Sequence, residues 1–370
     1  MRIRFRGGNV LCPDGQIRKT DLLIGDGVIL SLGDAEPEAE QTVDCAGRYL
    51  FPGLVDVHTH GRIGYDFTSA TAEQMKQMRD DYARRGVTSL FPTLASATPV
   101  QWHGAIAAVQ EVGFEGIHLE GRWLNPAKRG AHAVELLSPP DAADLASYLS
   151  EIHIPCHVTY APELDADGSF AATALSHGAT LGLGHSAATA AEARLAIARG
   201  VTSFTHLCNA MPPIHHREGG AVCEALTSDC YAELIADGLH VCPDMVKLIY
   251  RCKGAERLVL ITDSMEATGA PDGTYSIAGQ PAIVKNGRAQ TPDGALAGSL
   301  LNLWDGVKNL VSFAGAAPGD AILCATRNPA RMVGIDATVG TLEPGKRADL
   351  LLSDASLSLC AVYRCGEPVF

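Results

Sequence analysis

The middle of the chain alternates between short apolar runs and longer segments of helical composition. The runs are rich in β-branched or aromatic side chains and lie at 89–95, 116–121, 156–163, 180–186, 202–211, 232–240 and 258–264. Two segments between them, 186–200 and 242–254, have the composition of helices, and Ser186 and Gly200 mark the two ends of the first. A repeated order of strand, loop and helix predicts a parallel α/β fold.

Residues capable of catalysis stand at the C-terminal ends of these runs, which is where a parallel α/β barrel carries its active site. A doubly wound open sheet is the alternative, but no G-x-G-x-x-G motif follows an early run to support nucleotide binding. Both chain ends are β-rich, and Gly25, Asp26 and Gly27 predict a hairpin turn. We therefore expect an α/β protein with a (β/α)8 TIM-like barrel at 51–335 and a small β-sandwich domain formed by 1–50 and 336–370.

The net charge is −13, from 29 basic and 42 acidic residues. A surface of this sign repels nucleic acid and anionic membranes, so neither is expected as a partner. The first residues contain no apolar stretch of signal-peptide length, and no run reaches the roughly 18 apolar residues of a membrane span. We expect a cytoplasmic protein whose cysteines, which form no C-x-x-C pair, remain free thiols.

The segment FPGLVDVHTH, residues 51–60, ends in His58 and His60. On an extended strand this i, i+2 spacing points both imidazoles to the same side, so they can bind one ion. Any such residue alone has an ordinary explanation, since His185 could cap a helix and Asp263 could bind backbone amides. Four later runs repeat the layout, however, and end in a metal ligand or an acid: Glu120, His185, His206 and Asp263. Six residues at matching positions indicate a common site.

Imidazoles and carboxylates suit Zn²⁺, Fe²⁺, Mn²⁺ or Co²⁺. A metal with one open position lowers the pKa of bound water toward about 7 and so supplies hydroxide at neutral pH. A carboxylate outside the ligand set can collect the proton of the nucleophile and pass it to a leaving group. We assign this role to Asp263, because the fully apolar run before it predicts a site away from bulk water.

Further segments have compositions that suit a substrate. In the loop at 124–132, His132 could polarise a carbonyl oxygen, whereas Lys128 and Arg129 could equally form a solvated basic loop. The stretch NAMPPIHHREGG, residues 209–220, includes Arg217 and favours an anion in an otherwise acidic protein. Two more segments offer candidates for the same site, namely Asp237 with His240, and the small residues Ala297, Gly298 and Ser299, which permit close backbone approach.

Taken together, these segments resemble the N-acetylglucosamine-6-phosphate deacetylase family of the amidohydrolase superfamily. The matching motifs are PGLVDVHTHG, HLEG, LNPAKRGAH, GHS, THLCNAM with HHREGG, ADGLHV, LITDS, LAGS and the terminal GTLEPGKRADL. They cover nearly the whole chain in the expected order, and as a set they are highly specific. The resemblance implies a distorted barrel with a small β domain, usually in a homodimer. It also implies a hydrolase that removes acetate from a phosphorylated amino sugar, N-acetylglucosamine 6-phosphate.

The resemblance implies roles for individual residues as well. Glu120, His185 and His206 would bind a divalent metal, with Zn²⁺ expected first and Fe²⁺, Mn²⁺ and Co²⁺ as alternatives. His58 and His60 add a second metal in some members, so one or two ions per subunit are expected. Asp263 would be the catalytic acid and base. Ala131 and His132 would contact the sugar and the carbonyl. The residues that would bind the phosphate are Asn209, Ala210, Arg217 and His240. Arg217 would reach across the dimer into the other subunit's site, and His240 is a second candidate for this.

One departure concerns the residue after HLEG. Family members commonly carry proline there, whereas this chain has Arg122 before Trp123. Arginine relaxes the turn and brings a guanidinium near a metal ligand, where it either faces solvent or reads an extra anionic group. A different N-acyl sugar or amide substrate, or a catalytically inert barrel scaffold, therefore stays open. Opening of a cyclic amide is disfavoured, since no lysine stands at a strand end. The helical segments at 71–112 look short, which could reshape the entrance.

Overall fold

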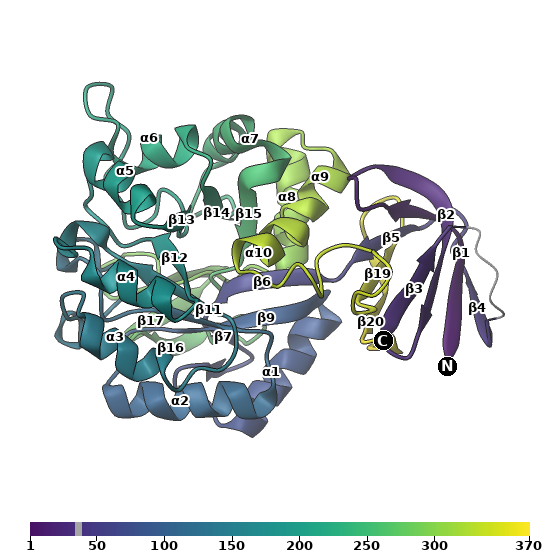
Figure 1. Ribbon diagram of the computed structural model, residues 1–370, viewed down its shortest axis with the longest axis horizontal. Helices are drawn as coiled ribbons and strands as arrows, with labels where there is room; N and C mark the ends of the chain where they lie inside the picture. Colours follow the sequence, from purple (N-terminus) through teal and green to yellow (C-terminus); the bar gives the residue numbers. More distant parts are fainter. Residues whose placement is uncertain (34–38) are drawn as a thin grey trace.

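Eight parallel strands form the central sheet of the barrel. The computed structural model describes residues 1–33 and 39–370 (Figure 1). In the sheet each strand pairs with the next along the chain, in the order β6 (Leu54–Thr59), β9 (Val87–Leu94), β10 (Ile117–Glu120), β11 (Cys156–Tyr160), β12 (Thr180–Leu183), β13 (Val201–Phe204), β14 (Tyr231–Ile235) and β15 (Leu258–Ile261). The first and last strands also meet, because the N–H of Asp263 donates to the carbonyl oxygen of His58 at 2.9 Å. The sheet therefore closes into a barrel, as predicted.

One helix follows each barrel strand and packs on the outside of the barrel (Figure 1). The eight are α1 (Ala72–Arg84), α2 (Pro99–Val112), α3 (Ala142–Leu149), α4 (Ser169–Ser176), α5 (Ala190–Ala198), α6 (Gly220–Thr227), α7 (Pro243–Arg257) and α8 (Leu303–Ala314), and α9 (Pro318–Leu323) and α10 (Arg327–Met332) come after them. Single 3-10 turns occur at η1 (Pro126–Lys128), η2 (Val134–Leu136) and η3 (Pro162–Leu164). The expectation of short helices at 71–112 is wrong, since α1 has 13 residues and α2 has 14.

Helix α5 begins three residues later than the sequence signal suggests. Its N-cap is Thr189, whose side chain accepts the N–H of Glu192, while the Glu192 carboxylate accepts the N–H of Thr189. This reciprocal capping box satisfies two N–H groups that the first helical turn leaves free. Ser186 instead donates its hydroxyl to Glu163 at 2.6 Å, so it belongs to the loop that leads from β12 to the helix.

The two ends of the chain share a second, mixed sheet (Figure 1). It contains β1 (Arg2–Leu11), β2 (Ile17–Gly25), β3 (Val28–Leu32), β4 (Gln41–Asp44), β5 (Tyr49–Pro52), β19 (Leu350–Ser353), β20 (Leu359–Arg364) and β21 (Glu367–Pro368). Strand β5 pairs antiparallel with β19, and the β2–β3 hairpin turns at Asp26 and Gly27, which have φ of 52° and 79°. The sheet packs around its own apolar core, which includes Phe5, Leu50 and Leu350. The predicted fold class is confirmed, while the division at 1–50, 51–335 and 336–370 stays a prediction.

A three-stranded antiparallel sheet is inserted between β15 and α8, and the sequence analysis did not anticipate it. It consists of β16 (Gly273–Ile277), β17 (Gln280–Lys285) and β18 (Arg288–Gln290). A shorter ribbon of β7 (Gly61–Arg62) and β8 (Tyr65–Asp66) follows β6. Ile277 and Ala278, at the end of β16, line a cavity at the mouth of the barrel, so the inserted sheet forms part of its wall.

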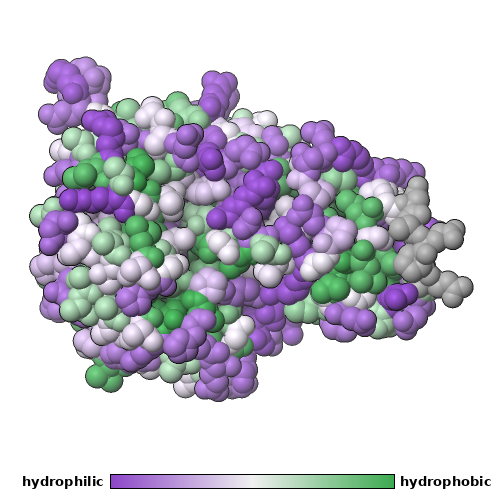
Figure 2. All heavy atoms as spheres, viewed as in Figure 1, coloured by the Kyte–Doolittle hydropathy of each residue, from purple (hydrophilic) through white to green (hydrophobic). Residues whose placement is uncertain are grey.

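Polar and charged residues cover much of the face shown in Figure 2, with hydrophobic residues distributed between them. This distribution agrees with the burial of many apolar side chains in the core of the barrel and in the core of the sheet formed by the two chain ends. Within the described part of the chain, no helix combines the length and the apolar composition needed to cross a bilayer.

Candidate active site

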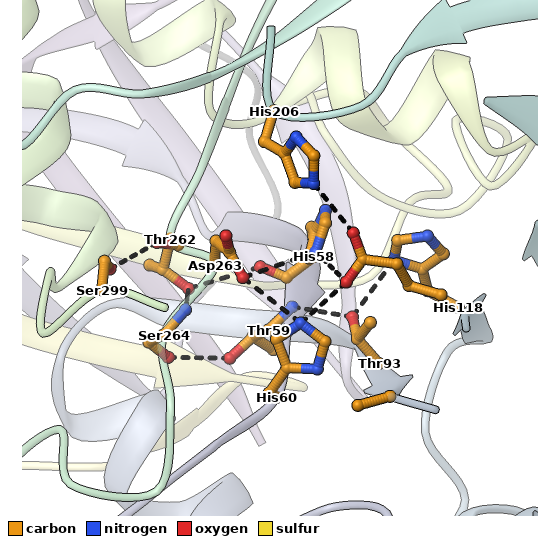
Figure 3. A network of polar contacts seen from close by, with 12 residues as sticks. His58, Thr59, His60, Thr93, His118, His206, Thr262, Asp263, Ser264 and Ser299 are labelled. Atoms are coloured by element: carbon orange, nitrogen blue, oxygen red, sulfur yellow. Dashed lines mark hydrogen bonds and ion pairs between the residues drawn. The ribbon is translucent and has the colours of Figure 1, made fainter. Parts of the chain in front are cut away.

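The six ligand and acid residues predicted from the sequence lie together at the C-terminal ends of the barrel strands. His58 and Glu120 are in the last residues of β6 and β10, while His185, His206 and Asp263 each follow the end of a strand by two residues. These last three have positive φ angles of 47°, 31° and 47°. A positive φ costs energy in any residue other than glycine, and such backbone strain is concentrated at functional sites. Figure 3 shows His58, His60, His206 and Asp263 turned toward a common centre.

Glu120 is that centre, and each of its carboxylate oxygens faces a different pair of histidines. Its Oε1 lies 3.2 Å from His185 Nε2 and 3.0 Å from His206 Nε2. Its Oε2 lies 2.9 Å from His60 Nε2 and 3.2 Å from His58 Nε2. Asp263 Oδ1 completes the second group, at 3.3 Å from His60 Nε2 and 3.6 Å from His58 Nε2.

The donor atoms of this cluster fit a metal centre. They form two groups that share Glu120, and within each group the atoms lie within 4.8 Å of one another. Two imidazole nitrogens, His185 Nε2 and His206 Nε2, approach to 3.0 Å in a buried site. Such crowding of lone pairs is unfavourable unless a cation or a proton lies between them. Nitrogen and carboxylate donors in this number suit one or two divalent ions.

The outer nitrogens of two histidines are fixed by hydrogen bonds to acceptors. His58 Nδ1 lies 3.0 Å from Glu233 Oε2, and His185 Nδ1 lies 2.8 Å from the carbonyl oxygen of Lys128. Each acceptor holds a proton on Nδ1, which leaves the Nε2 lone pair directed at the cluster. Lys128 therefore contributes its main chain rather than its charge. Gly184, before His185, allows the chain to pass close to Thr159, since a Cβ at position 184 would lie 2.6 Å from Thr159 Cγ2.

Glu233 on β14 was not found by the sequence analysis. Its side chain is fully buried, and besides His58 it accepts the backbone N–H of His206 at 3.2 Å. The signal was present in the run AELIADGLH, where Glu233 is a charged residue between apolar ones. The sequence analysis also missed His118 and His157, which lie inside the barrel. His118 forms a hydrogen bond with the Thr159 hydroxyl and His157 with the Thr180 hydroxyl, each at 2.8 Å.

Charge and burial oppose each other in this cluster. Burial alone would raise the pKa of Glu120, but the surrounding imidazoles, His58 first and then His185 and His206, hold this pKa well below the ordinary value. For Asp263, burial is again outweighed, here by His58 and His60, and its pKa is lowered to about 2. Both carboxylates are therefore ionised at neutral pH.

A cavity of about 300 Å³ opens above the cluster. One wall carries His60, Glu120, His185, His206 and Asp263, and the inserted sheet and the loop after it supply Ile277, Ala278, Ala295 and Leu296. Of the predicted substrate contacts, Ala131, His132, Asn209, Ala210, His240 and Gly298 line it. The cavity thus combines ionised carboxylates, imidazoles and an apolar side.

His132 and His240 are held by specific partners. His132 Nδ1 lies 2.8 Å from Ser96 Oγ, and its Nε2 lies 4.0 Å from Glu120 Oε2. Burial and then the neighbouring His185 lower the pKa of His132 well below its usual range, so the ring is neutral. His240 Nδ1 lies 2.7 Å from Asp237 Oδ2, and His240 lines the cavity of its own chain.

Three predicted contacts lie elsewhere. Ala297 and Ser299 are buried behind Gly298 and do not line the cavity. Ser299 instead fixes the strand end, because its N–H donates to the carbonyl oxygen of Asp263 at 2.7 Å. Arg217 is exposed in the loop between β13 and α6, where its Nη1 lies 2.8 Å from His216 Nε2, and it does not line the cavity of its own chain.

Arg122 points away from the cavity. Its guanidinium pairs with Asp144 on α3 at 3.2 Å and lies over the ring of Tyr148. Its φ is 62°, and its N–H donates to Ser96 Oγ at 3.0 Å. Proline could do neither, because its ring fixes φ near −65° and it has no N–H. The replacement therefore changes the loop behind the site and adds no charge to the cavity.

The sequence and the fold both match known proteins. Residues 49–364 match the amidohydrolase family. The N-acetylgalactosamine-6-phosphate deacetylase of Escherichia coli O157:H7 is 34% identical over 98% of both chains. The N-acetylglucosamine-6-phosphate deacetylase of Bacillus subtilis (strain 168) is 34% identical over 94% of this chain and 92% of its own.

A solved structure agrees. It is a mutant of the N-acetyl-D-glucosamine-6-phosphate deacetylase of Mycobacterium smegmatis in complex with N-acetyl-D-glucosamine-6-phosphate. It is 32% identical to this chain, covers 100% of this chain and 99% of its own, and superposes with a TM-score of 0.91. The chain therefore belongs to the amidohydrolase family and, within it, to the N-acetylglucosamine-6-phosphate deacetylase family.

Proposed function

We propose that this protein is a metal-dependent deacetylase that removes acetate from N-acetylglucosamine 6-phosphate. The observation that carries the proposal is the buried cluster in which Glu120 joins two groups of histidines beside Asp263, in the wall of a cavity. A cavity of about 300 Å³ is at the lower end of the range for small-molecule sites. The names of relatives that match nearly the whole chain support the substrate class.

The metal would be held by the two groups of donors. Glu120, His185 and His206 form one site, and Glu120 with His58 and His60, beside Asp263, forms the other. We infer Zn²⁺ as the first candidate, since imidazole and carboxylate ligands suit it, with Fe²⁺, Mn²⁺ and Co²⁺ as alternatives. A bound divalent cation would supply Lewis acidity, which polarises an amide carbonyl and makes a water molecule more acidic.

The protein's own residues would carry the proton. Asp263 accepts a proton from water as the water oxygen attacks the acyl carbon. His132 donates a hydrogen bond to the acyl oxygen as negative charge develops on it. Asp263 then returns the proton to the amide nitrogen as the bond between carbon and nitrogen breaks, because an unprotonated amine leaves poorly. The products are acetate and the free amino sugar phosphate.

The remaining lining residues would orient the sugar. Ala131, Asn209, Ala210, His240 and Gly298 line the same cavity as the histidine cluster. We propose that the phosphate lies toward His240. Arg217, which is exposed, would reach the phosphate in the site of a partner subunit of a homodimer.

The test is a substrate panel given to metal-reconstituted protein, with released acetate as the measurement. The panel contains N-acetylglucosamine and N-acetylgalactosamine, each with and without a 6-phosphate. We expect the highest kcat/KM for N-acetylglucosamine 6-phosphate and no turnover after exhaustive chelation. The second candidate substrate is N-acetylgalactosamine 6-phosphate, after which one of the relatives is named, and a preference for it would establish that candidate. Absence of acetate release from every compound would refute the proposal.

A further inference from the structure

His132 receives two hydrogen bonds at one ring nitrogen, both from Ser96. The Ser96 residue follows the end of β9 by two positions, and both side chains are buried. His132 Nδ1 lies 2.8 Å from Ser96 Oγ and accepts the backbone N–H of Ser96 at 3.4 Å. A backbone N–H can only donate, so Nδ1 carries no proton and the ring proton lies on Nε2.

The Ser96 hydroxyl is oriented by a third residue. Its oxygen accepts the N–H of Arg122 at 3.0 Å, which leaves the hydroxyl proton to donate to His132 Nδ1. Gly121 makes this approach possible, because a Cβ there would lie 2.5 Å from the backbone nitrogen of Ser96. The hydrogen bonds therefore run in one direction, from Arg122 through Ser96 to His132. Both donors at Nδ1 favour the same tautomer.

The opposite side of the imidazole faces the reaction. His132 Nε2 lies 4.0 Å from Glu120 Oε2, and His132 lines the same cavity as Glu120 and Asp263. We propose that Ser96 is a positioning residue that holds His132 as the Nε2–H tautomer, so that the ring donates to the acyl oxygen of an amide in the cavity. The inference deepens the proposed deacetylation and rests on it for the identity of the acceptor.

The expected effect lies in kcat rather than in KM. Without the hydroxyl, only the longer bond from the Ser96 N–H holds the ring, so it can rotate or take the other tautomer. A ring with a lone pair on Nε2 would repel the acyl oxygen, and most strongly in the transition state, where that oxygen is negative.

The kinetic test compares three variants of metal-loaded protein. Ser96→Ala should lower kcat roughly tenfold with little change in KM, as expected for one lost hydrogen bond. Ser96→Thr keeps the hydroxyl and should restore most of kcat. Its methyl group has room, since Ser96 also lines a second cavity of about 180 Å³. Ser69→Ala is the matched control, because Ser69 lines that same cavity but its hydroxyl donates to the carbonyl oxygen of Asp66.

A spectroscopic test reads the tautomer directly. Ring ¹⁵N resonances of histidine-labelled protein distinguish a protonated from an unprotonated Nδ1, and the His132→Gln variant identifies the His132 signals. We expect Nε2–H in the wild type and loss of that pure signature in Ser96→Ala, with metal content equal in both. A protonated Nδ1 in the wild type, or full kcat in Ser96→Ala, would overturn the inference. The spectra decide even if the substrate panel shows no deacetylation, so failure of the proposed function is told apart from failure of this inference.

Discussion

At the scale of single residues, Asp263 is placed by its own backbone. The strand before it is fully buried, and a φ of 47° turns its carboxylate toward His60 rather than outward. The Ser299 N–H holds its carbonyl oxygen, and its own N–H donates to the His58 carbonyl oxygen. The carboxylate is therefore fixed at the cavity wall, where it can exchange a proton with a bound substrate.

Asp263→Asn should lower kcat at least about 100-fold, because an amide cannot accept the proton that the reaction releases. Metal content, measured by atomic absorption, should fall little, since Glu120 and the four histidines remain. Asp336→Asn, outside the cavity, is the control and should keep wild-type kcat. Near-normal turnover of Asp263→Asn with metal bound would remove the assignment.

Glu233→Gln tests the carboxylate behind His58. The substitution keeps the shape but removes the charge that holds the proton on His58 Nδ1 at 3.0 Å. Loss of such a supporting partner typically weakens metal affinity roughly 10–100-fold. Competition with a chelator of known affinity measures this without an activity assay. Glu224→Gln, whose partner Arg194 is on the surface, should bind metal as the wild type does, and an equal affinity in Glu233→Gln would contradict the prediction.

At the scale of elements, three of the barrel helices begin with a local capping signal. Helices α1, α2 and α5 all start with a threonine N-cap and a capping box: Thr71 with Gln74, Thr98 with Gln101, and Thr189 with Glu192. Because the cap fixes where the helix begins, it also fixes the length of the loop that carries the functional residue.

Thr189→Ala should lower the free energy of unfolding by about 1 kcal/mol, the usual cost of a lost N-cap hydrogen bond. The urea midpoint of the metal-loaded protein, followed by circular dichroism, measures the change. Thr189→Ser keeps the hydroxyl and should stay close to the wild type. A midpoint of the alanine variant equal to that of the serine variant would show that the cap does not stabilise α5.

At the scale of the whole molecule, Arg347 joins the C-terminal segment to the barrel. Its guanidinium pairs with Glu115 and Asp349 and donates to the Ser89 hydroxyl of β9 at 2.7 Å. The carboxylates are mostly buried, with side-chain exposures of 11% and 5%. Water can therefore solvate their negative charges only poorly if the arginine is removed.

Arg347→Met should destabilise the protein by roughly 3 kcal/mol, because it leaves the buried Asp349 carboxylate without its cation and Glu115 with only the more distant Arg364, at 3.5 Å. Arg194→Met removes an exposed pair and should cost less than about 1 kcal/mol. Thermal unfolding of both variants, with metal bound, makes the comparison. A Tm of Arg347→Met equal to that of Arg194→Met would contradict the role given to Arg347.

Arg217→Ala tests the contribution of a second subunit. If the arginine binds phosphate across a homodimer, KM should rise roughly tenfold or more for a 6-phosphorylated substrate, the cost of a lost charged hydrogen bond. The unphosphorylated sugar should be affected little. Arg194→Ala, also exposed, is the control for the lost charge. Equal losses for both sugars would exclude a phosphate contact, and sedimentation analysis would show whether the dimer exists.

The sequence alone determined the alternation of barrel strands and helices and the candidate ligand residues at the strand ends. Both follow from local chemistry, because apolar runs form strands and the parallel arrangement brings their C-terminal ends to one face of the barrel. Thus His58, Glu120, His185, His206 and Asp263 could be named without coordinates.

The tertiary structure alone decided which residues support them. Glu233 contacts His58 across 175 positions and Ser96 contacts His132 across 36, and such pairs exist only once the barrel has closed. The inserted sheet at 273–290, the burial of Ala297 and Ser299 and the direction of Arg122 were likewise beyond the sequence. Packing between distant segments sets all of these, and a linear pattern of residue types does not encode which distant neighbour a side chain will meet.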